Sequence, residues 1–410
     1  MQYRENKKNG DKLSTLGFGC MRLPQKKGTP GSGKIDEGRA TAQVRMAVDQ
    51  GINFIDTAYL YHLGASEPFL GRALTDGYRD KVKLCTKLPC WLPTGPQDMD
   101  TILNRQLERL NTDRLDYYLV HGLNGPLWDK MKAMGIVDFL DRAKSDGRVV
   151  STGFSFHGEQ EAFLRIVDDY DWDCCMIQYN YLDENCQAGR KGLQYAASKD
   201  LGVFVMEPLR GGLLAAPPPA VEKIWARTEE KRTPAEWALR WIWNHPEVTV
   251  ILSGMNEEEH IRDNIRIAGE AQPGSLSPHD LDLIESVRNE YMSLMKTACT
   301  GCSYCLPCPR GVDIPACFET YNYKHMHDDA RWGQIFYLMR VGGATEGSSP
   351  GKASQCTGCG QCLEKCPQNI PIPDLLNNIS AEMEGRLFNT TVKAVRLFNR
   401  FQRWKLRRGQ

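Results

Sequence analysis

Val203-Phe204-Val205-Met206 is a continuously apolar stretch, and the acidic residue Glu207 follows it directly. Val248–Leu252 is a second stretch of the same character. Strands of a parallel sheet have such sequences when helices cover both faces of the sheet. Both stretches therefore predict buried, parallel β-strands.

Similar apolar runs recur in both directions from this stretch, at intervals of roughly 25–35 residues, with helical patterns between them. The amphipathic segments Ala40–Gln50 and Asp98–Leu110 are examples, and Thr233-Pro234 is a typical helix start. The predicted strands end at Leu23, Asp56, Lys87, His121, Ser155, Tyr179, Glu207 and Ser253. Eight such alternations favour an α/β fold of the (β/α)8 TIM-barrel type, with a doubly wound open sheet as the alternative. Gly17-Phe18-Gly19 lacks the third glycine of a dinucleotide-binding Rossmann turn.

The composition is that of a globular protein and argues against several classes of function. The chain has 410 residues, with 51 Lys+Arg against 51 Asp+Glu. The zero net charge gives no global attraction to nucleic acid or to a membrane surface. We expect no signal peptide at the start, no transmembrane segment and a cytoplasmic location.

Cysteine usage divides the chain. Nine of the 15 cysteines lie between Cys299 and Cys366. We therefore expect a barrel over residues 1–295, a small iron–sulfur domain over 296–385, and a basic C-terminal helix or tail over 386–410. A disulfide framework is not expected for a cytoplasmic protein.

Two cysteine motifs follow the barrel. Cys356-Thr-Gly-Cys359-Gly-Gln-Cys362-Leu-Glu-Lys-Cys366-Pro367 is the bacterial ferredoxin spacing, in which three thiolates bind one [4Fe–4S] cluster and the fourth binds another. The upstream motif is Cys299-Thr-Gly-Cys302-Ser-Tyr-Cys305-Leu-Pro-Cys308-Pro309. It has two residues before its last cysteine, where the ferredoxin spacing has three. The predicted ligands are Cys299, Cys302, Cys305 and Cys366 for one cluster, and Cys308, Cys356, Cys359 and Cys362 for the other. Cys317 is an alternative to Cys308, and zinc is the alternative metal.

Helical segments are predicted around these motifs. Residues 316–324 and 331–339 have helical patterns, and another helix is expected from Pro373 to about Arg386. The second domain therefore resembles the mainly helical ferredoxin-like type. The tail 392–410 is basic and amphipathic, which suits packing on its own domain, a membrane surface or an acidic partner.

Polar residues stand where the predicted strands end. The carboxyl ends of barrel strands form the mouth in which barrel enzymes place their active sites. We therefore expect one cluster of six polar side chains, from Asp56, Lys87, His121, Ser155, Gln178 and Glu207.

These strand ends carry a family resemblance. The chain resembles the aldo-keto reductases over roughly residues 12–290, and a subgroup of that family with a ferredoxin-like appendage. The motifs, in family order, are Phe54-Ile55-Asp56-Thr57-Ala58-Tyr59-Leu60-Tyr61 with Gly64 and Ser66-Glu67, Cys85-Thr86-Lys87, Leu115–His121, Gly153-Phe154-Ser155, Gln178-Tyr179-Asn180 and Gly254–Asn264.

The resemblance implies a catalytic tetrad of Asp56, Tyr61, Lys87 and His121. A carbonyl that accepts a hydride also needs a proton, which Tyr61 would donate. A buried Lys87 is expected to lower the pKa of that phenol, with Asp56 holding the ammonium. His121 would hydrogen-bond the substrate carbonyl.

The resemblance also implies cofactor contacts. These are Ser155 and Gln178 for the nicotinamide, Met206 in place of the family's stacking Tyr, Leu209, Arg210 and Gly211 for the diphosphate, and Ser253, Gly254, Asn256, His260 and Asn264 in the nucleotide loop. Phe156 replaces a family Asn. The cofactors expected are two [4Fe–4S] clusters and NADH or NADPH, with a flavin left open.

The function expected is therefore carbonyl/alcohol interconversion on a small substrate by an iron–sulfur oxidoreductase. A ferredoxin-type electron partner is expected, and nucleic acid is not. The alternative is an electron-transfer or regulatory protein whose barrel binds a nucleotide or flavin and takes electrons from a ferredoxin.

Overall fold

A computed structural model describes residues 1–26, 34–326, 330–344, 350–395 and 397. The chain divides into two compact units, each described by itself below. The first contains Met1–Ala215 and Arg232–Asp282, and the second contains Ala216–Lys231 and the chain from Leu283. The domain limits expected from the sequence stay a prediction.

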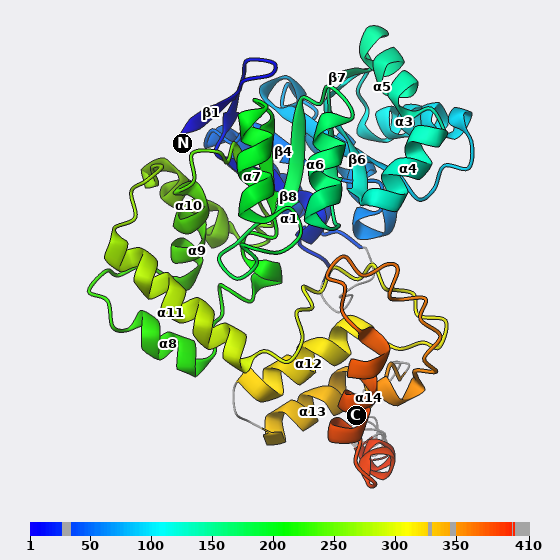
Figure 1. Ribbon diagram of the computed structural model, residues 1–410, viewed down its shortest axis with the longest axis vertical. Helices are drawn as coiled ribbons and strands as arrows, with labels where there is room; N and C mark the ends of the chain where they lie inside the picture. The colour runs from blue at the N-terminus through cyan, green and yellow to red at the C-terminus, as the bar shows by residue number, and fades with distance from the viewer. Residues whose placement is uncertain (27–33, 327–329, 345–349, 396, 398–410) are drawn as a thin grey trace, which may run out of the picture. The chain divides into compact units, whose positions relative to one another are not determined.

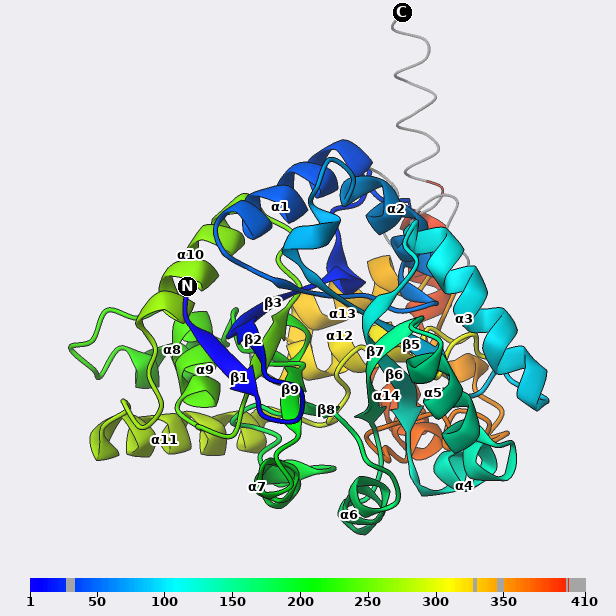
Figure 2. The ribbon, with the colours of Figure 1, turned by 90° about the horizontal axis from the view of Figure 1, so that it is seen from above.

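Eight parallel strands form a closed barrel in the first unit (Figures 1 and 2). They are β3 (Leu16–Gly19), β4 (Phe54–Asp56), β5 (Lys83–Pro89), β6 (Leu115–Leu123), β7 (Val149–Phe156), β8 (Cys174–Gln178), β9 (Gly202–Met206) and β10 (Val250–Ser253). The barrel closes where Ile251 pairs with Leu16. The (β/α)8 prediction is confirmed, and the open-sheet alternative is wrong.

Helices surround these strands (Figure 2). They are α1 (Glu37–Asp49), α2 (Ser66–Ala73), α3 (Pro96–Leu110), α4 (Gly125–Ala133), α5 (Ile136–Ser145), α6 (Gln160–Asp168), α7 (Gly189–Ser198), α9 (Pro234–Trp243) and α10 (Glu258–Glu270). The expected start of α9 is confirmed, because the Thr233 side chain accepts a hydrogen bond from the Glu236 N–H at the helix N-terminus. Met99, Leu103 and Leu110 form the buried side of α3.

The barrel interior is filled by apolar side chains. Phe54, Tyr117 and Phe204 pack with their ring centroids 4.7–5.4 Å apart. Leu13 joins this cluster from β2 (Asp11–Ser14), which pairs with β1 (Tyr3–Asn6) in an antiparallel hairpin. Polar chemistry is thereby confined to the strand ends.

The end of one predicted strand differs in the structure. The first strand was expected to end at Leu23, but β3 ends at Gly19 and a 3-10 turn, η1 (Cys20–Arg22), follows. The His62 Nε2 atom accepts a hydrogen bond from the Leu23 N–H at 3.1 Å, which fixes the chain after η1 outside the sheet. Pro219 begins α8 (Pro219–Trp225), since proline suits the first turn of a helix.

The second unit is mainly helical. Besides α8 it contains most of α11 (Pro278–Leu294), and then α12 (Ile314–Met326), α13 (Ala330–Arg340) and α14 (Ile372–Met383), with α12 packed against α13 and α14 (Figure 1). Its core includes Phe318, Tyr337 and Ile379, and six motif cysteines pack against it. The end of the tail, residues 398–410, lies outside the described residues. None of the helices described here is both long and apolar enough to span a bilayer.

Candidate active site and iron–sulfur ligands

Lys87 is the centre of the polar cluster at the barrel mouth. Its Nζ atom donates to Asp56 Oδ1 at 2.6 Å, to the Thr57 carbonyl oxygen at 2.8 Å and to Tyr61 Oη at 3.3 Å. Lys87 is 1% exposed and Asp56 is 3% exposed. Burial of this ion pair is tolerated because every ammonium proton has an oxygen acceptor.

A strained turn carries Tyr61 to this ammonium. Tyr61 begins η2 (Tyr61–Gly64), directly after the β4 loop. His62 and Leu63 have φ angles of 53° and 57°, a left-handed conformation that is costly for residues with a side chain. The bond from the Leu23 N–H to His62 Nε2 holds the turn in this conformation.

The pKa of Tyr61 moves in the direction opposite to the one expected. Burial raises the pKa of the phenol well above its usual value, and the Asp56 carboxylate raises it further. Asp56 is also hydrogen-bonded to the Lys87 ammonium, so the carboxylate that opposes ionisation of the phenol is held beside it. The net shift in the protein without ligands is therefore upward, opposite to the expected lowering by Lys87, and the phenol is neutral.

His121 is the fourth member of the predicted tetrad. It lies in β6, is 4% exposed, and its ring centroid is 6.3 Å from that of Tyr61. Burial, and then the charge of Lys87, hold the pKa of His121 well below its usual value. The imidazole is therefore neutral at pH 7. Trp91 packs beside it with a centroid distance of 5.2 Å.

The residues expected to bind the nicotinamide already have protein partners. Ser155 Oγ accepts a hydrogen bond from the Gly122 N–H at 2.7 Å. Gln178 Nε2 donates to Asp183 Oδ2 at 2.8 Å, and Gln178 Oε1 accepts from Gln187 Nε2 at 3.2 Å. Phe156, which replaces the family Asn, packs against Phe163 of α6 and so points away from the barrel interior.

Asp183 contacts two predicted site residues, Gln178 and Arg210, and the sequence reasoning missed it. It forms a buried ion pair with Arg210, whose Nε lies 3.2 Å from Asp183 Oδ2. Arg210 was expected at the diphosphate, but this pair removes its guanidinium from solvent. Asn180 accepts the N–H groups of Leu182 and Asp183, an Asx-type turn that the sequence signals only weakly.

The predicted nucleotide loop follows β10. Asn264 Nδ2 donates to Ser253 Oγ at 3.1 Å, so these two residues are brought together. The Asn256 carbonyl oxygen accepts from Gln43 at 3.1 Å. His260 and Gly254 are exposed. Leu209, a predicted site residue, directly precedes the turn η4 (Arg210–Gly212), and Gly211, another, lies within it. Met206 packs against the apolar cluster of the barrel interior.

The acidic residues of this loop are held by another residue that was not predicted. Arg39 of α1 donates to Glu258 at 2.7 and 3.0 Å and also contacts Glu257. These hydrogen bonds lower the pKa of Glu258 to about 2. The loop therefore stays negatively charged near the start of α10.

In the second unit the predicted ligand cysteines fall into two groups. Burial, and then the nearby thiols of Cys302, Cys299 and Cys366, raise the pKa of the Cys305 thiol to about 12. Burial likewise raises the pKa of the Cys362 thiol, and the nearby thiols of Cys356, Cys308 and Cys359 raise it further. The two groups are the two predicted ligand sets. Among the described residues, no three His, Cys, Asp or Glu side chains meet the geometry of a single-ion site.

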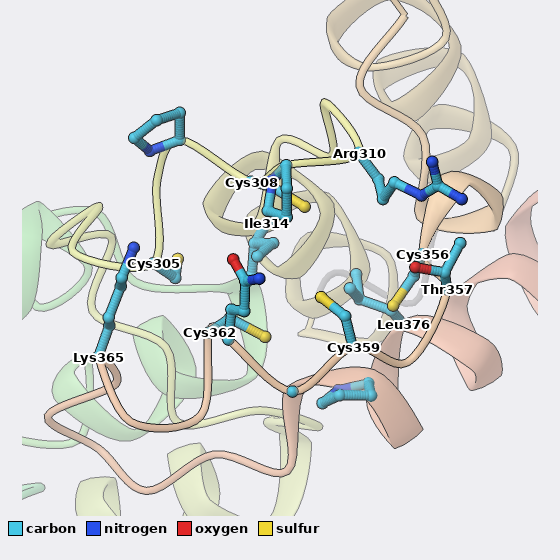
Figure 3. A pocket seen from close by; sticks show the side chains of 15 residues that line it. Cys305, Cys308, Arg310, Ile314, Cys356, Thr357, Cys359, Cys362, Lys365 and Leu376 are labelled. Atoms are coloured by element: carbon cyan, nitrogen blue, oxygen red, sulfur yellow. The ribbon is translucent and has the colours of Figure 1, made fainter.

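A pocket is lined by the second cysteine group (Figure 3). Cys308, Cys356, Cys359 and Cys362 line it, together with Cys305 of the first group and the cations of Arg310 and Lys365. Cys317 instead lies buried in α12, where its thiol contacts the Gly351 carbonyl oxygen at 3.5 Å and Tyr337 Oη at 3.9 Å. This geometry favours Cys308 over Cys317.

Comparisons with known proteins agree with both parts of the chain. The sequence profile of the Aldo/keto reductase family matches residues 15–288, and that of a 4Fe-4S dicluster domain matches residues 298–370. The chain is 25% identical over 312 residues to an uncharacterized oxidoreductase, YrpG of Bacillus subtilis (strain 168). That match covers 65% of this chain and 90% of the relative.

Solved structures share the barrel fold. An aldo-keto reductase from Bacillus halodurans, in its holo form, matches with a TM-score of 0.59 at 23% identity, covering 70% of this chain and 96% of that chain. An aldo/keto reductase from Klebsiella pneumoniae, solved in complex with NADP and acetate, has a TM-score of 0.56 at 22% identity, with the same coverage.

Proposed function

The chain belongs to the aldo/keto reductase family and is an oxidoreductase with an iron–sulfur domain, and from this premise we propose that its barrel interconverts a small carbonyl compound and an alcohol. The observation that carries the proposal is the contact of Lys87 Nζ with both Asp56 and Tyr61 at the strand ends. NADH or NADPH, when bound, supplies the hydride to the carbonyl carbon.

Tyr61 moves the proton. Its Oη atom donates a proton to the carbonyl oxygen, which otherwise becomes an alkoxide when the carbon accepts the hydride. The raised pKa of Tyr61 keeps the phenol protonated at neutral pH. The Lys87 ammonium, 3.3 Å away, stabilises the phenolate left behind, which then takes a proton from water.

His121 orients the substrate. A neutral imidazole donates one N–H to the carbonyl oxygen without competing for the proton that Tyr61 supplies. Burial and the nearby Lys87 charge keep His121 neutral. Trp91, beside His121 and 37% exposed, would contact the apolar part of the substrate.

The residues present fit a nicotinamide dinucleotide in part. Ser155, Gln178 and Met206 would lie along the nicotinamide, and Ser253, Gly254, Asn256, His260 and Asn264 along the nucleotide. Gln178 donates to Asp183 and accepts from Gln187, so it would bind the carboxamide by exchanging a present partner for the cofactor.

The cysteines would hold two [4Fe–4S] clusters, one on each ligand set described above. We assign them to single-electron transfer with a ferredoxin-type carrier. Cys359 is exposed and is flanked by Gly358 and Gly360, whose φ angles of 69° and 75° suit a tight ligand loop. An exposed ligand places one edge of the cluster at the surface, where a carrier can reach it.

The reaction is tested with Tyr61→Phe in the cluster-loaded protein. Carbonyl reduction by NADH or NADPH is expected to fall roughly 100- to 10,000-fold, the usual worth of a proton donor. Tyr59→Phe is the matched control, because Tyr59 is two residues away and its ring packs on Arg109 instead. Unchanged turnover in Tyr61→Phe would show that the tetrad is wrong.

The role of the clusters is tested by an anaerobic visible spectrum before and after NADH or NADPH is added. Hydride transfer moves two electrons together, whereas each cluster accepts one. We expect no bleaching by the dinucleotide and bleaching by a reduced ferredoxin. Bleaching by the dinucleotide would require a converter such as a flavin.

A further inference from the structure

Arg22 is an exposed cation at the barrel mouth. It is the last residue of η1, directly after β3, and its side chain is exposed. It makes no hydrogen bond and no ion pair with any other residue that the structure describes. The bond between the Leu23 N–H and His62 fixes the backbone beside it. The backbone of Arg22 is therefore fixed near the mouth, and its exposed side chain is available to a ligand.

Gly254 makes room for the Arg22 side chain. A β-carbon at position 254 would lie 3.1 Å from Cβ of Arg22 and 3.4 Å from its Cγ and Cδ atoms. Gly254 is the first residue after β10, in the proposed nucleotide loop. The aliphatic stem of Arg22 thus lies along the backbone of that loop.

Glu207 faces Arg22 from the end of β9. Burial raises the pKa of its carboxyl group, whereas the charge of Arg22 lowers it. The same carboxylate accepts a hydrogen bond from the Gly211 N–H. Glu207 has a left-handed φ of 55°, and its carbonyl oxygen accepts a hydrogen bond from Asn180 Nδ2 at 3.0 Å. The charge of Arg22, which follows β3, and the Gly211 amide, which follows β9, thus act on one carboxylate, and these two strands flank β10 in the barrel.

We propose that Arg22 and the Gly211 amide bind the diphosphate of the nicotinamide dinucleotide, and that the Glu207 carboxylate, which accepts the Gly211 N–H while the dinucleotide is absent, releases it to the diphosphate. The inference rests on the proposed function, since it takes the dinucleotide as the ligand. A guanidinium and a loop amide are the usual partners of phosphate oxygens.

Charge at the neighbouring positions supports this assignment. Glu257, Glu258 and Glu259 leave the start of the nucleotide helix acidic, and Arg39 is already bound to two of them. Arg210 is engaged with Asp183. Arg39 and Arg210 are thus both bound to carboxylates. Of these three arginines, Arg22 is therefore the one that would neutralise a diphosphate at the mouth.

The test measures binding, independently of turnover. Dissociation constants of NADH and NADPH are measured anaerobically for the cluster-loaded protein by nicotinamide fluorescence, with inorganic pyrophosphate as a competitor. The variants are Arg22→Met, which keeps the stem over Gly254, Arg22→Lys, which restores the charge, and Glu207→Gln. Arg105→Met is the matched control, since Arg105 is an exposed arginine on α3.

Loss of the charge-assisted hydrogen bonds should weaken dinucleotide binding roughly 10- to 100-fold in Arg22→Met, with partial recovery in Arg22→Lys. Glu207→Gln removes the competing carboxylate and should tighten binding roughly 2- to 5-fold. In Arg22→Met the Glu207→Gln change should tighten binding less, and pyrophosphate should compete less well than in the wild type.

Three outcomes overturn parts of the reasoning. If Arg22→Met and Arg105→Met both bind the dinucleotides as tightly as the wild type does, this inference is overturned and the proposed function stands. Equal losses in Arg22→Met and Arg105→Met overturn it too, because they would reflect net charge alone. A wild type that binds neither dinucleotide overturns the proposed function, and this inference with it.

Discussion

Replacing Lys87 with methionine should destabilise the barrel strongly. The methionine side chain would fill nearly the same space, but the Asp56 carboxylate would lose the ammonium that lies 2.6 Å from it. Both side chains are at most 4% exposed, so water cannot replace the lost partner. Removing one member of a buried ion pair costs about 3–5 kcal/mol.

The loss should depend on pH because Asp56 can take up a proton. Burial already raises the pKa of Asp56, and without Lys87 it would rise further. The unfolded carboxyl titrates near its ordinary value of about 3.9, so between the two pKa values the folded state binds more protons and stability falls as pH rises. The destabilisation should therefore be larger at pH 8 than at pH 5.

The assay is urea unfolding of the cluster-loaded protein under anaerobic conditions, followed by tryptophan fluorescence. The matched variant is the double change Asp56→Asn with Lys87→Met, which removes both charges and should recover most of the lost stability without recovering turnover. An unfolding midpoint for Lys87→Met equal to that of the wild type, or a double variant as unstable as the single one, would refute the buried-pair reasoning.

Two further predictions concern single residues. Cys308→Ser should reduce the iron content from about eight toward four atoms per chain, whereas Cys317→Ser should leave it unchanged. The iron content is measured after anaerobic reconstitution of both variants. A loss of iron in Cys317→Ser alone would assign the ligand to Cys317. Burial lowers the pKa of His157 to about 4. Because the unfolded histidine binds its proton near pH 6.5, the wild type should lose stability as pH falls from 6.5 to 4, and His157→Gln should lose less over that range; parallel curves for the two proteins would show that His157 titrates normally.

The barrel was predictable because its signals are local. Continuous apolar runs such as Val203–Met206 reflect strands buried on both faces, and the alternation with helical patterns sets the strand count. Asp56 ends β4 and Lys87 lies near the end of the neighbouring strand β5, so their contact follows from the fold. The cysteine spacing likewise predicts the ligand sets, because it alone determines which thiolates a short loop can bring to one cluster.

The rest of the site depends on contacts that exist only after the barrel closes. Arg22 meets Gly254 because the first and last strands pair, and nothing near Arg22 in the chain signals this. Asp183 and Arg210 come from loops after different strands. The pKa of Tyr61 was expected in the wrong direction, because the effect of burial and of carboxylates exceeds that of one lysine.

Isotope transfer tests the central claim most directly. The cluster-loaded protein is incubated anaerobically with NADH and NADPH deuterated at C4 of the nicotinamide, together with a panel of small aldehydes and ketones. Mass spectrometry then locates deuterium in the alcohols formed. The account predicts deuterium on the carbinol carbon with the wild type and with Tyr59→Phe, and nearly none with Tyr61→Phe. Deuterated alcohol formed equally by Tyr61→Phe, or no deuterated alcohol from the wild type with any carbonyl tested, would contradict it.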